Sequence, residues 1–234
     1  MSQPLIHLQN LKFGWPGNSE PLLICKDFRI DCGEHLFIRG ASGSGKSTLL
    51  NLIAAVMVAP QGQLSVCNEN LSAMSARKRD QFRADHIGFI FQQFNLVPYL
   101  NLVENILLPC RFSNLREQKA SQQFGNAENA ACFLMKQLFP NDHLDPLSPV
   151  ANLSVGQQQR IAAARALIGN PDIVIADEPT SSLDADSRER FINLLFEQAE
   201  SAGSTLLFVS HDPALGQRFE RIVDIEVFRS GANP

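Results

Sequence analysis

Short apolar runs, separated by polar and glycine-containing segments, dominate the hydrophobic pattern of this chain. Four runs are aliphatic at their centres and too short for a helix, as the strands of a buried parallel sheet are. They cover residues 35–39, 86–91, 173–176 and 205–209. Two further runs, at 5–13 and 22–30, also predict strands, and a short strand is expected at 63–66.

Between these strands the apolar positions follow the three-and-four spacing of an amphipathic helix. Helices are predicted from residue 49 onward, from a capped start at Asn101, over 115–138, from Leu153 to Ile168, and over 186–202. Residues 140–149 contain three prolines and predict a loop. We therefore expect an α/β core with a helical insertion whose two ends return to the same sheet.

A glycine-rich segment lies between the strand at 35–39 and the helix that follows it. Its pattern, G-x-x-x-x-G-K-[ST], is typical of a phosphate-binding loop, where glycines let backbone N–H groups turn toward phosphates. Lys46 adds positive charge for the outer phosphates, and the Ser47 hydroxyl is placed to ligate Mg²⁺. The expected phosphate-binding residues are Gly40, Ser42, Gly43, Ser44, Gly45, Lys46, Ser47 and Thr48. The flanking strand and helix favour this interpretation over an ordinary glycine-serine turn.

Polar side chains follow three of the apolar strands. Gln92 follows the strand at 86–91, Asp177 and Glu178 follow 173–176, and His211 follows 205–209. Carboxyl ends of parallel strands meet at one edge of a sheet, which is where α/β proteins bind ligands. Hydrolysis of a nucleoside triphosphate needs such a set.

In that chemistry, Asp177 would hold Mg²⁺ through water and Glu178 would polarise the attacking water. Gln92 would contact metal and water, and His211 would donate a hydrogen bond to the terminal phosphate. A structural histidine and a solvated glutamine are the alternatives for the last two.

Composition limits the remaining possibilities. The chain has 234 residues, 44% of them hydrophobic, and can bury a sizeable core. Its formal net charge is −4 and its basic residues are dispersed, which argues against nucleic acid as a partner. No apolar run approaches the ~20 residues that cross a bilayer. Five cysteines without C-x-x-C spacing disfavour a disulfide framework and a zinc site.

The segment Leu153-Ser154-Val155-Gly156-Gln157 resembles the signature sequence of ATP-binding cassette (ABC) ATPases. The resemblance covers residues 15–211, with every motif in the family's order. It implies a phosphate-loop NTPase core with a mainly parallel sheet, an N-terminal antiparallel β subdomain and a helical insertion. On this basis residues 1–234 form a single ABC ATPase domain, with the core in 1–92 and 153–234 and the helical subdomain in 93–152.

The resemblance also implies a homodimer that works head to tail and uses ATP and Mg²⁺. Ser154, Gly156 and Gln157 of one subunit would close over ATP held by the phosphate loop of the other. Free N–H groups at a helix N-terminus near Gly156 would suit the γ-phosphate. The segment at 181–184 resembles the family's D-loop, so that Asp184 would reach across the dimer interface.

Trp15 lies in a turn-rich segment and has two interpretations. The indole could stack on a nucleotide base, or it could pack on the edge of a sheet. The resemblance favours the first, because an aromatic residue, usually tyrosine, stacks on adenine in this family.

Val155 stands where the signature usually has glycine. A β-branched residue resists positive φ, so this position is either in an ordinary helical or extended conformation, or the contact to the γ-phosphate is altered. Because Ser154 and Gly156 are retained, we expect the contact to survive.

Residues 91–106 look most like those of the lipoprotein-release and macrolide-exporter group (LolD/MacB-like), which also contains the cell-division ATPase FtsE. This implies an ATPase on the inner, cytoplasmic face of the membrane, held there by a permease. The permease would dock near Phe94, Leu96, Val97 and Leu100, residues whose alternative place is a buried core.

Export or extraction of a lipoprotein, peptide or drug is the leading hypothesis. The alternatives are a regulatory ATPase that controls a wall-remodelling partner and, less favoured by the acidic balance, a soluble ATPase on DNA or ribosomes.

Overall fold

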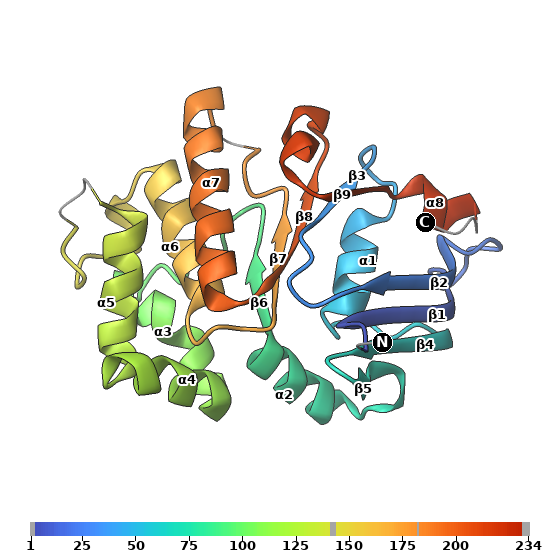
Figure 1. Cartoon of the computed structure of the whole chain (residues 1–234), viewed down its shortest axis with the longest axis horizontal. Coiled ribbons are helices and arrows are strands. Elements are labelled where there is room, and N and C mark those ends of the chain that lie inside the picture. Colours follow the sequence, from blue (N-terminus) through green and yellow to red (C-terminus); the bar gives the residue numbers. More distant parts are fainter. Residues whose placement is uncertain (1–2, 141–143, 182, 231–234) are drawn as a thin grey trace. The chain divides into compact units, whose positions relative to one another are not determined.

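The computed structural model describes residues 3–140, 144–181 and 183–230 (Figure 1). Its described residues divide into two units. Unit 1 holds those up to residue 83 and from 205 onward, and unit 2 holds those from 84 to 204.

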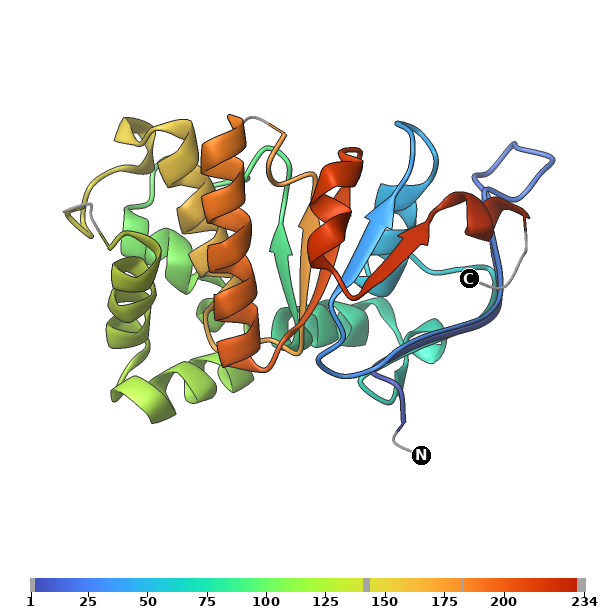
Figure 2. The same cartoon turned by 45° about the horizontal axis from the view of Figure 1, so that its top comes forward.

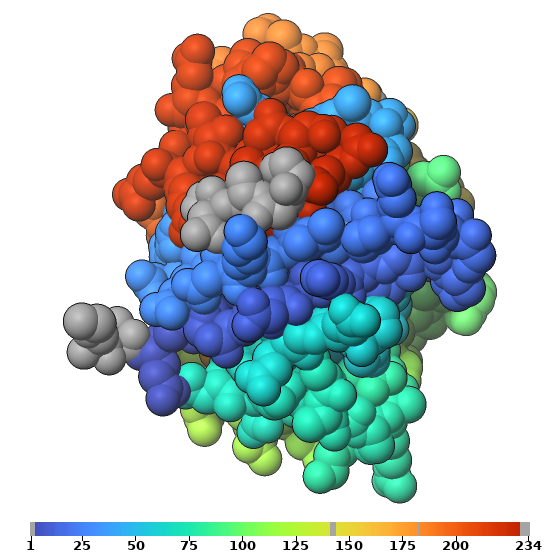
Figure 3. Space-filling view, turned by 90° about the vertical axis from the view of Figure 1, so that its right-hand side faces the viewer, coloured from blue at the N-terminus to red at the C-terminus, as the bar shows by residue number. Residues whose placement is uncertain are grey.

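Unit 1 contains an antiparallel sheet with the strand order β2-β1-β4-β5. Its strands are β1 (Ile6–Phe13), β2 (Leu23–Ile30), β4 (Gln61–Val66) and β5 (Glu69–Asn70), and Figure 1 shows the three longer ones side by side. Leu8 pairs with Phe28, and both are buried, so the apolar residues of β1 and β2 share one face. Figure 3 shows β1 and β2 (blue) beside the segment of β4 and β5 (cyan). The antiparallel sheet implied by the family resemblance is confirmed.

Three parallel strands of unit 1 lie in the order β8-β3-β9. They are β3 (Leu36–Arg39), β8 (Thr205–Ser210) and β9 (Arg221–Asp224). Every residue of β8 is buried, as expected for a parallel strand covered on both faces. The helix α1 (Lys46–Ile53) follows β3, and the short helix α8 (Glu226–Ser230) follows β9. Unit 1 also contains the 3₁₀ turns η1 (Leu71–Ala73) and η3 (Pro213–Arg218) and most of the helix α2 (Ala76–His86).

Unit 2 is built around two parallel strands, β6 (Ile87–Ile90) and β7 (Ile173–Asp177). The first begins one residue later than expected, because His86 is the last residue of the helix α2 (Ala76–His86). Gly88 lets β6 approach the helix α6 (Val155–Leu167) closely, since a Cβ at this position would lie 2.1 Å from the Ala166 carbonyl oxygen.

The helices of unit 2 share an apolar core. They are α3 (Leu102–Phe112), α4 (Asn114–Phe124), α5 (Ala127–Leu138), α6, and α7 (Ala185–Ala202), with the 3₁₀ turn η2 (Val150–Asn152) before α6. Figure 2 shows α7 running alongside α6. None of the described helices has the length and apolar character needed to cross a bilayer. The subdomain boundaries expected at 93 and 152 stay a prediction.

The helical stretch predicted over 115–138 is confirmed, and it consists of two helices, α4 and α5. Gly125 adopts a left-handed φ of 84° at the end of α4, and the Asn126 side chain caps α5 by accepting the Asn129 N–H. The capped start at Asn101 is confirmed, with reciprocal hydrogen bonds between Asn101 and Glu104.

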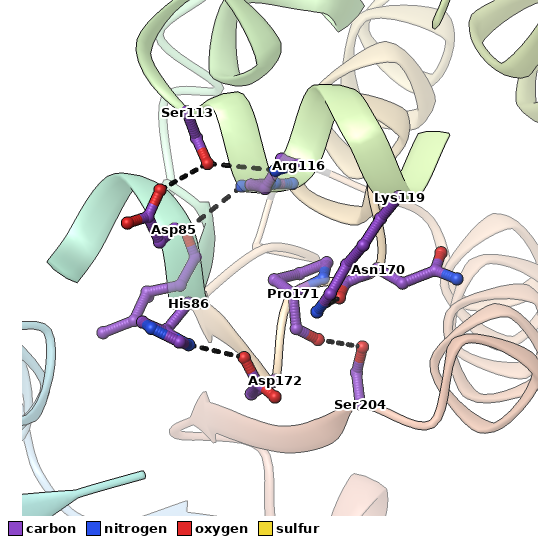
Figure 4. Close-up of polar contacts among 10 residues, drawn as sticks. Asp85, His86, Ser113, Arg116, Lys119, Asn170, Pro171, Asp172 and Ser204 are labelled. Atoms are coloured by element: carbon purple, nitrogen blue, oxygen red, sulfur yellow. Dashed lines mark hydrogen bonds and ion pairs between the residues drawn. The ribbon is translucent and has the colours of Figure 1, made fainter. Parts of the chain in front are cut away.

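Arg116 of α4 is completely buried and holds the C-terminal end of α6. Figure 4 shows Arg116 beside Ser113, which in turn contacts Asp85. The Arg116 guanidinium donates to the carbonyl oxygen of Ala166 at 2.6 Å and, from Nε, to that of Ile168 at 2.8 Å. These carbonyls lie where an α-helix runs out of its own donors. Ser113 donates to Asp85 and accepts the Arg116 N–H. Burial lowers the pKa of Arg116 to about 10, so the group stays charged at neutral pH.

We therefore expect Arg116→Met to lower the free energy of unfolding by about 2–4 kcal/mol, because it leaves several buried carbonyls without a donor. Urea denaturation monitored by circular dichroism measures this. Lys119→Met is the control: Lys119 donates to the Asn170 carbonyl at an exposed position and should cost about 1 kcal/mol or less. An equal loss of unfolding free energy for the two variants would contradict the role of Arg116 in holding the end of α6.

Candidate nucleotide-binding site

The glycine-rich loop of unit 1 connects β3 to α1, as predicted. Gly43 and Gly45 have φ values of 76° and 103°, which L-residues adopt at a cost in free energy. At Gly40 a Cβ would lie 2.3 Å from Cγ2 of Ile225. Side chains at these positions would therefore strain or displace the loop.

Lys46 places its charge within this loop. The side chain is buried, and Nζ donates to the carbonyl oxygens of Gly40 at 2.8 Å and Ala41 at 2.9 Å. Ser44 Oγ donates to the Ala41 carbonyl at 2.6 Å. No side chain caps the N-terminus of α1, whose first amides suit an anion. The loop thus combines a fixed ammonium group with a helix N-terminus, while Ser47 is exposed and Thr48 buried.

His211 follows a strand that pairs with the strand before the loop. In the parallel register of β3 and β8, Arg39 is opposite Ser210. Gly40 and His211 are the next residues of their strands, so both lie at the same carboxyl edge. His211 is exposed there.

In unit 2, Gln92 and Glu178 lie at matching positions. Ile90 of β6 is opposite Ala176 of β7, and each polar residue follows two positions later. Asp177 ends β7, and Glu178 is a non-glycine residue with a φ of 48°. Gln92 is exposed, and the two carboxylates are partly buried. The structure thus brings Gln92 together with Asp177 and Glu178 within unit 2, and His211 with the phosphate loop within unit 1.

Ser154 caps α6, and Val155 is the first residue of that helix. The Ser154 hydroxyl accepts the Gln157 N–H at 3.3 Å, and the Gln157 side chain accepts the Ser154 N–H at 3.0 Å. Val155 is not among the described residues with positive φ. It therefore adopts the ordinary helical conformation, one of the two possibilities that the substitution of glycine allowed. The capping box begins the helix at Val155, two residues after the predicted start at Leu153 and directly before Gly156.

Asp184 caps α7 by accepting the Ser187 N–H at 2.9 Å. That backbone hydrogen bond is the main reason that the pKa of Asp184 lies below its usual value. Ser182, another residue of the segment that resembles the D-loop, lies outside the described residues.

Trp15 packs on a neighbouring ring and is exposed over about half of its surface. Its ring packs edge-on against Phe13, with centroids 5.4 Å apart, yet 47% of the residue is exposed. It lines an open hollow of unit 1 together with Asn18, Pro21 and Gln61.

The expectation that Phe94 belongs to an exposed apolar groove is wrong, because the residue is buried. Phe94 and Asn95 both have left-handed φ values, 58° and 49°, and this turn folds the phenyl ring inward. Arg165 of α6 donates to the carbonyl oxygens of Phe94 at 2.5 Å and of Asn95 at 2.6 Å. Burial lowers the pKa of Arg165 to about 10. Leu96, Val97 and Leu100 are partly buried, whereas Tyr99 is 85% exposed.

Arg165 is the residue that sequence reasoning missed here. It lies in the alanine-rich interior of α6, at a position where a charged side chain breaks an otherwise apolar face. An arginine buried in such a segment needs polar partners, and that was the available signal.

We expect Gly45→Ala to abolish binding of a nucleoside triphosphate to the purified chain. The new methyl group would meet Leu23 at 3.2 Å, and the residue would have to keep its left-handed φ. Gly33→Ala is the matched control in unit 1, since Gly33 also has positive φ but no atom within 4 Å of the position that a methyl group would take. Fluorescence titration with a labelled nucleotide checks this, and equal affinities for the two variants would contradict it.

Comparisons with known proteins show the family to which the chain belongs. The family model described as ABC transporter matches residues 26–181. The bacitracin export ATP-binding protein BceA of Halalkalibacterium halodurans is 34% identical over 92% of this chain and 81% of its own length. The macrolide export ATP-binding/permease protein MacB of Shigella flexneri is 33% identical over 99% of this chain, which spans 34% of MacB.

Among solved structures, a dimeric post-hydrolysis state of the ATP-binding cassette MJ0796, bound to ADP and Pi, superposes with a TM-score of 0.79. It is 32% identical, and the match covers 94% of this chain and 93% of that one. The chain therefore belongs to the ABC transporter family and is an ATP-binding ATPase subunit of it.

Proposed function

We propose that this chain hydrolyses ATP to drive export or extraction of a lipoprotein, peptide or drug through a membrane permease. Two relatives support this, since BceA is named for bacitracin export and MacB for macrolide export. MacB also joins an ATP-binding part to a permease part.

The observation that carries the proposal is the matched placement of Gln92 and Glu178 beyond paired strands. In our proposal the carboxyl edge of β6 and β7 supplies the groups that act on the attacking water. Glu178 accepts a proton from the attacking water, and Gln92 orients that water. His211 donates a hydrogen bond to the γ-phosphate, and Lys46 neutralises charge on the outer phosphates.

The available oxygen donors fit Mg²⁺, which prefers hard oxygen ligands. Ser47 exposes its hydroxyl at the start of α1, and Asp177 presents its carboxylate at the end of β7. With Gln92 they would hold the ion, and its charge would offset that of the β- and γ-phosphates.

We further propose that two chains pair head to tail, each completing the other's ATP site. Ser154, Val155 and Gly156 lie at the N-terminus of α6, where amide groups suit the γ-phosphate. The related cassette MJ0796 is dimeric in the solved structure, which supports pairing. Asp184 and Gln157 would contribute from the same side of the interface, and Trp15 would stack on adenine.

The permease contact is proposed at residues 96–100. Tyr99 projects from this turn and is largely exposed, flanked by the partly buried Leu96, Val97 and Leu100. A tyrosine with an apolar ring and a polar hydroxyl is well suited to an interface. Through this contact the subunit would sit at the inner face of the membrane.

Glu178→Gln tests the proposal. We expect kcat for ATP hydrolysis to fall about 10²-fold or more, because the base is lost while shape and hydrogen bonding are kept. The variant should dimerise in Mg-ATP, as measured by size-exclusion chromatography with light scattering. Glu197→Gln, an exposed position on α7, is the control and should behave like the unaltered chain. A Glu178→Gln variant that hydrolyses ATP at the normal rate would refute the proposal.

A further inference from the structure

The turn that carries Glu178 is held by a side chain from α6. Gln159 is 1% exposed, and its Nε2 donates to the carbonyl oxygen of Pro179 at 2.6 Å. Pro179 is the residue directly after Glu178. The contact therefore acts one peptide away from the proposed base.

The backbone of this turn is strained at Glu178 and lacks an N–H at Pro179. Glu178 has a φ of 48°, which costs free energy in a non-glycine residue, and Pro179 has no N–H to donate. Two backbone hydrogen bonds close the turn, from Ser181 N to Glu178 O at 3.3 Å and from Leu183 N to Thr180 O at 3.2 Å. Both are longer than the contact from Gln159.

The orientation of the Gln159 amide is determined by its partner. A carbonyl can only accept, so the amide must present its NH₂ group to Pro179. The other end, Oε1, is buried and has no hydrogen-bond partner among residues 3–140, 144–181 and 183–230. A buried acceptor without a partner is unfavourable for stability. A side chain chosen for stability alone would be apolar, since methionine fills nearly the same volume.

We infer that Gln159 is a positioning residue for ATP hydrolysis: through Pro179 it fixes the backbone of Glu178, and with it the direction of the carboxylate toward the attacking water. This inference rests on the proposed role of Glu178. Catalysis depends steeply on such placement, because small errors in the position of a base lower kcat strongly.

The same helix links Gln159 to the signature serine. Ser154, which is proposed to contact the partner subunit's ATP, caps α6 five residues before Gln159. At 1.5 Å per residue this is about 7.5 Å along the axis. A movement of α6 when Ser154 engages nucleotide would therefore be passed directly to the turn of Glu178.

Gln159→Met is the first test. It removes the hydrogen bond to Pro179 together with the unpartnered acceptor, so we expect the midpoint of thermal unfolding to stay within a few degrees. By contrast, kcat should fall about 10-fold to 100-fold, with KM for ATP changed by less than about 2-fold. Gln122→Met, the same substitution at an exposed position on α4, is the control and should leave kcat and KM unchanged.

Gln159→Glu is a conservative variant that can restore the hydrogen bond to Pro179. A protonated carboxylic acid can donate to the Pro179 carbonyl as the amide does, whereas a carboxylate cannot. Burial favours the protonated form, so kcat of this variant, relative to the unaltered chain at the same pH, should be highest near pH 6 and fall as pH rises. A merely structural role would give no such pH profile once unfolding is excluded at each pH.

The outcomes distinguish the positioning role from the ATPase assignment. If the unaltered chain and Gln122→Met both hydrolyse ATP and Gln159→Met matches them, the positioning role is wrong while the ATPase assignment stands. If kcat of Gln159→Met falls only under conditions where the variant also unfolds, the positioning role is likewise wrong. If the unaltered chain hydrolyses no ATP, the proposed function fails and the positioning role falls with it.

Discussion

Carbonyl groups in the turns after parallel strands need hydrogen-bond donors that the sheet no longer supplies, and buried side chains provide them in both units. Lys46 donates to Gly40 and Ala41 in the phosphate loop. In unit 2, Arg165 donates to the turn after Gln92, and Gln159 donates to the turn after Glu178. Buried backbone groups rarely lack partners, so each of these side chains supplies a hydrogen bond that the backbone itself does not provide.

The turns that receive these hydrogen bonds also contain the residues proposed to bind and hydrolyse ATP. Three of the turns contain residues with left-handed φ, namely Gly43, Gly45, Phe94, Asn95 and Glu178. Such conformations persist where surrounding structure holds them, and they cluster at functional sites. In unit 2 the side chains that donate to the two turns, Arg165 and Gln159, both come from α6. Arg116 donates to the carbonyl groups at the end of that helix. The helix that begins at the signature serine therefore supports the turns of Gln92 and Glu178 together.

Sequence reasoning predicted the features that have local causes. The phosphate loop, the strands and the cap at Asn101 follow from glycine spacing, apolar runs and capping residues within a few positions. It failed where the cause lies far away in the chain. The burial of Phe94 depends on Arg165, which lies 71 residues later in the chain. The turn of Glu178 depends on the hydrogen bond that Gln159 donates to Pro179. A hydrophobic pattern does not reveal such long-range partners of polar side chains. The break at Gly125 was missed for a different reason, because a single glycine is tolerated within a helical pattern.

The most direct test of the account asks whether each ATP site is shared between two chains. Lys46→Ala and Ser154→Ala should each abolish hydrolysis alone, because every site in either homodimer is damaged. In a head-to-tail dimer of one chain of each, one site has an intact phosphate loop and an intact signature. Mixing the two inactive variants should therefore restore up to about a quarter of the normal rate, since half of the dimers are mixed and each has one intact site. A mixture no more active than either variant alone would contradict the shared site.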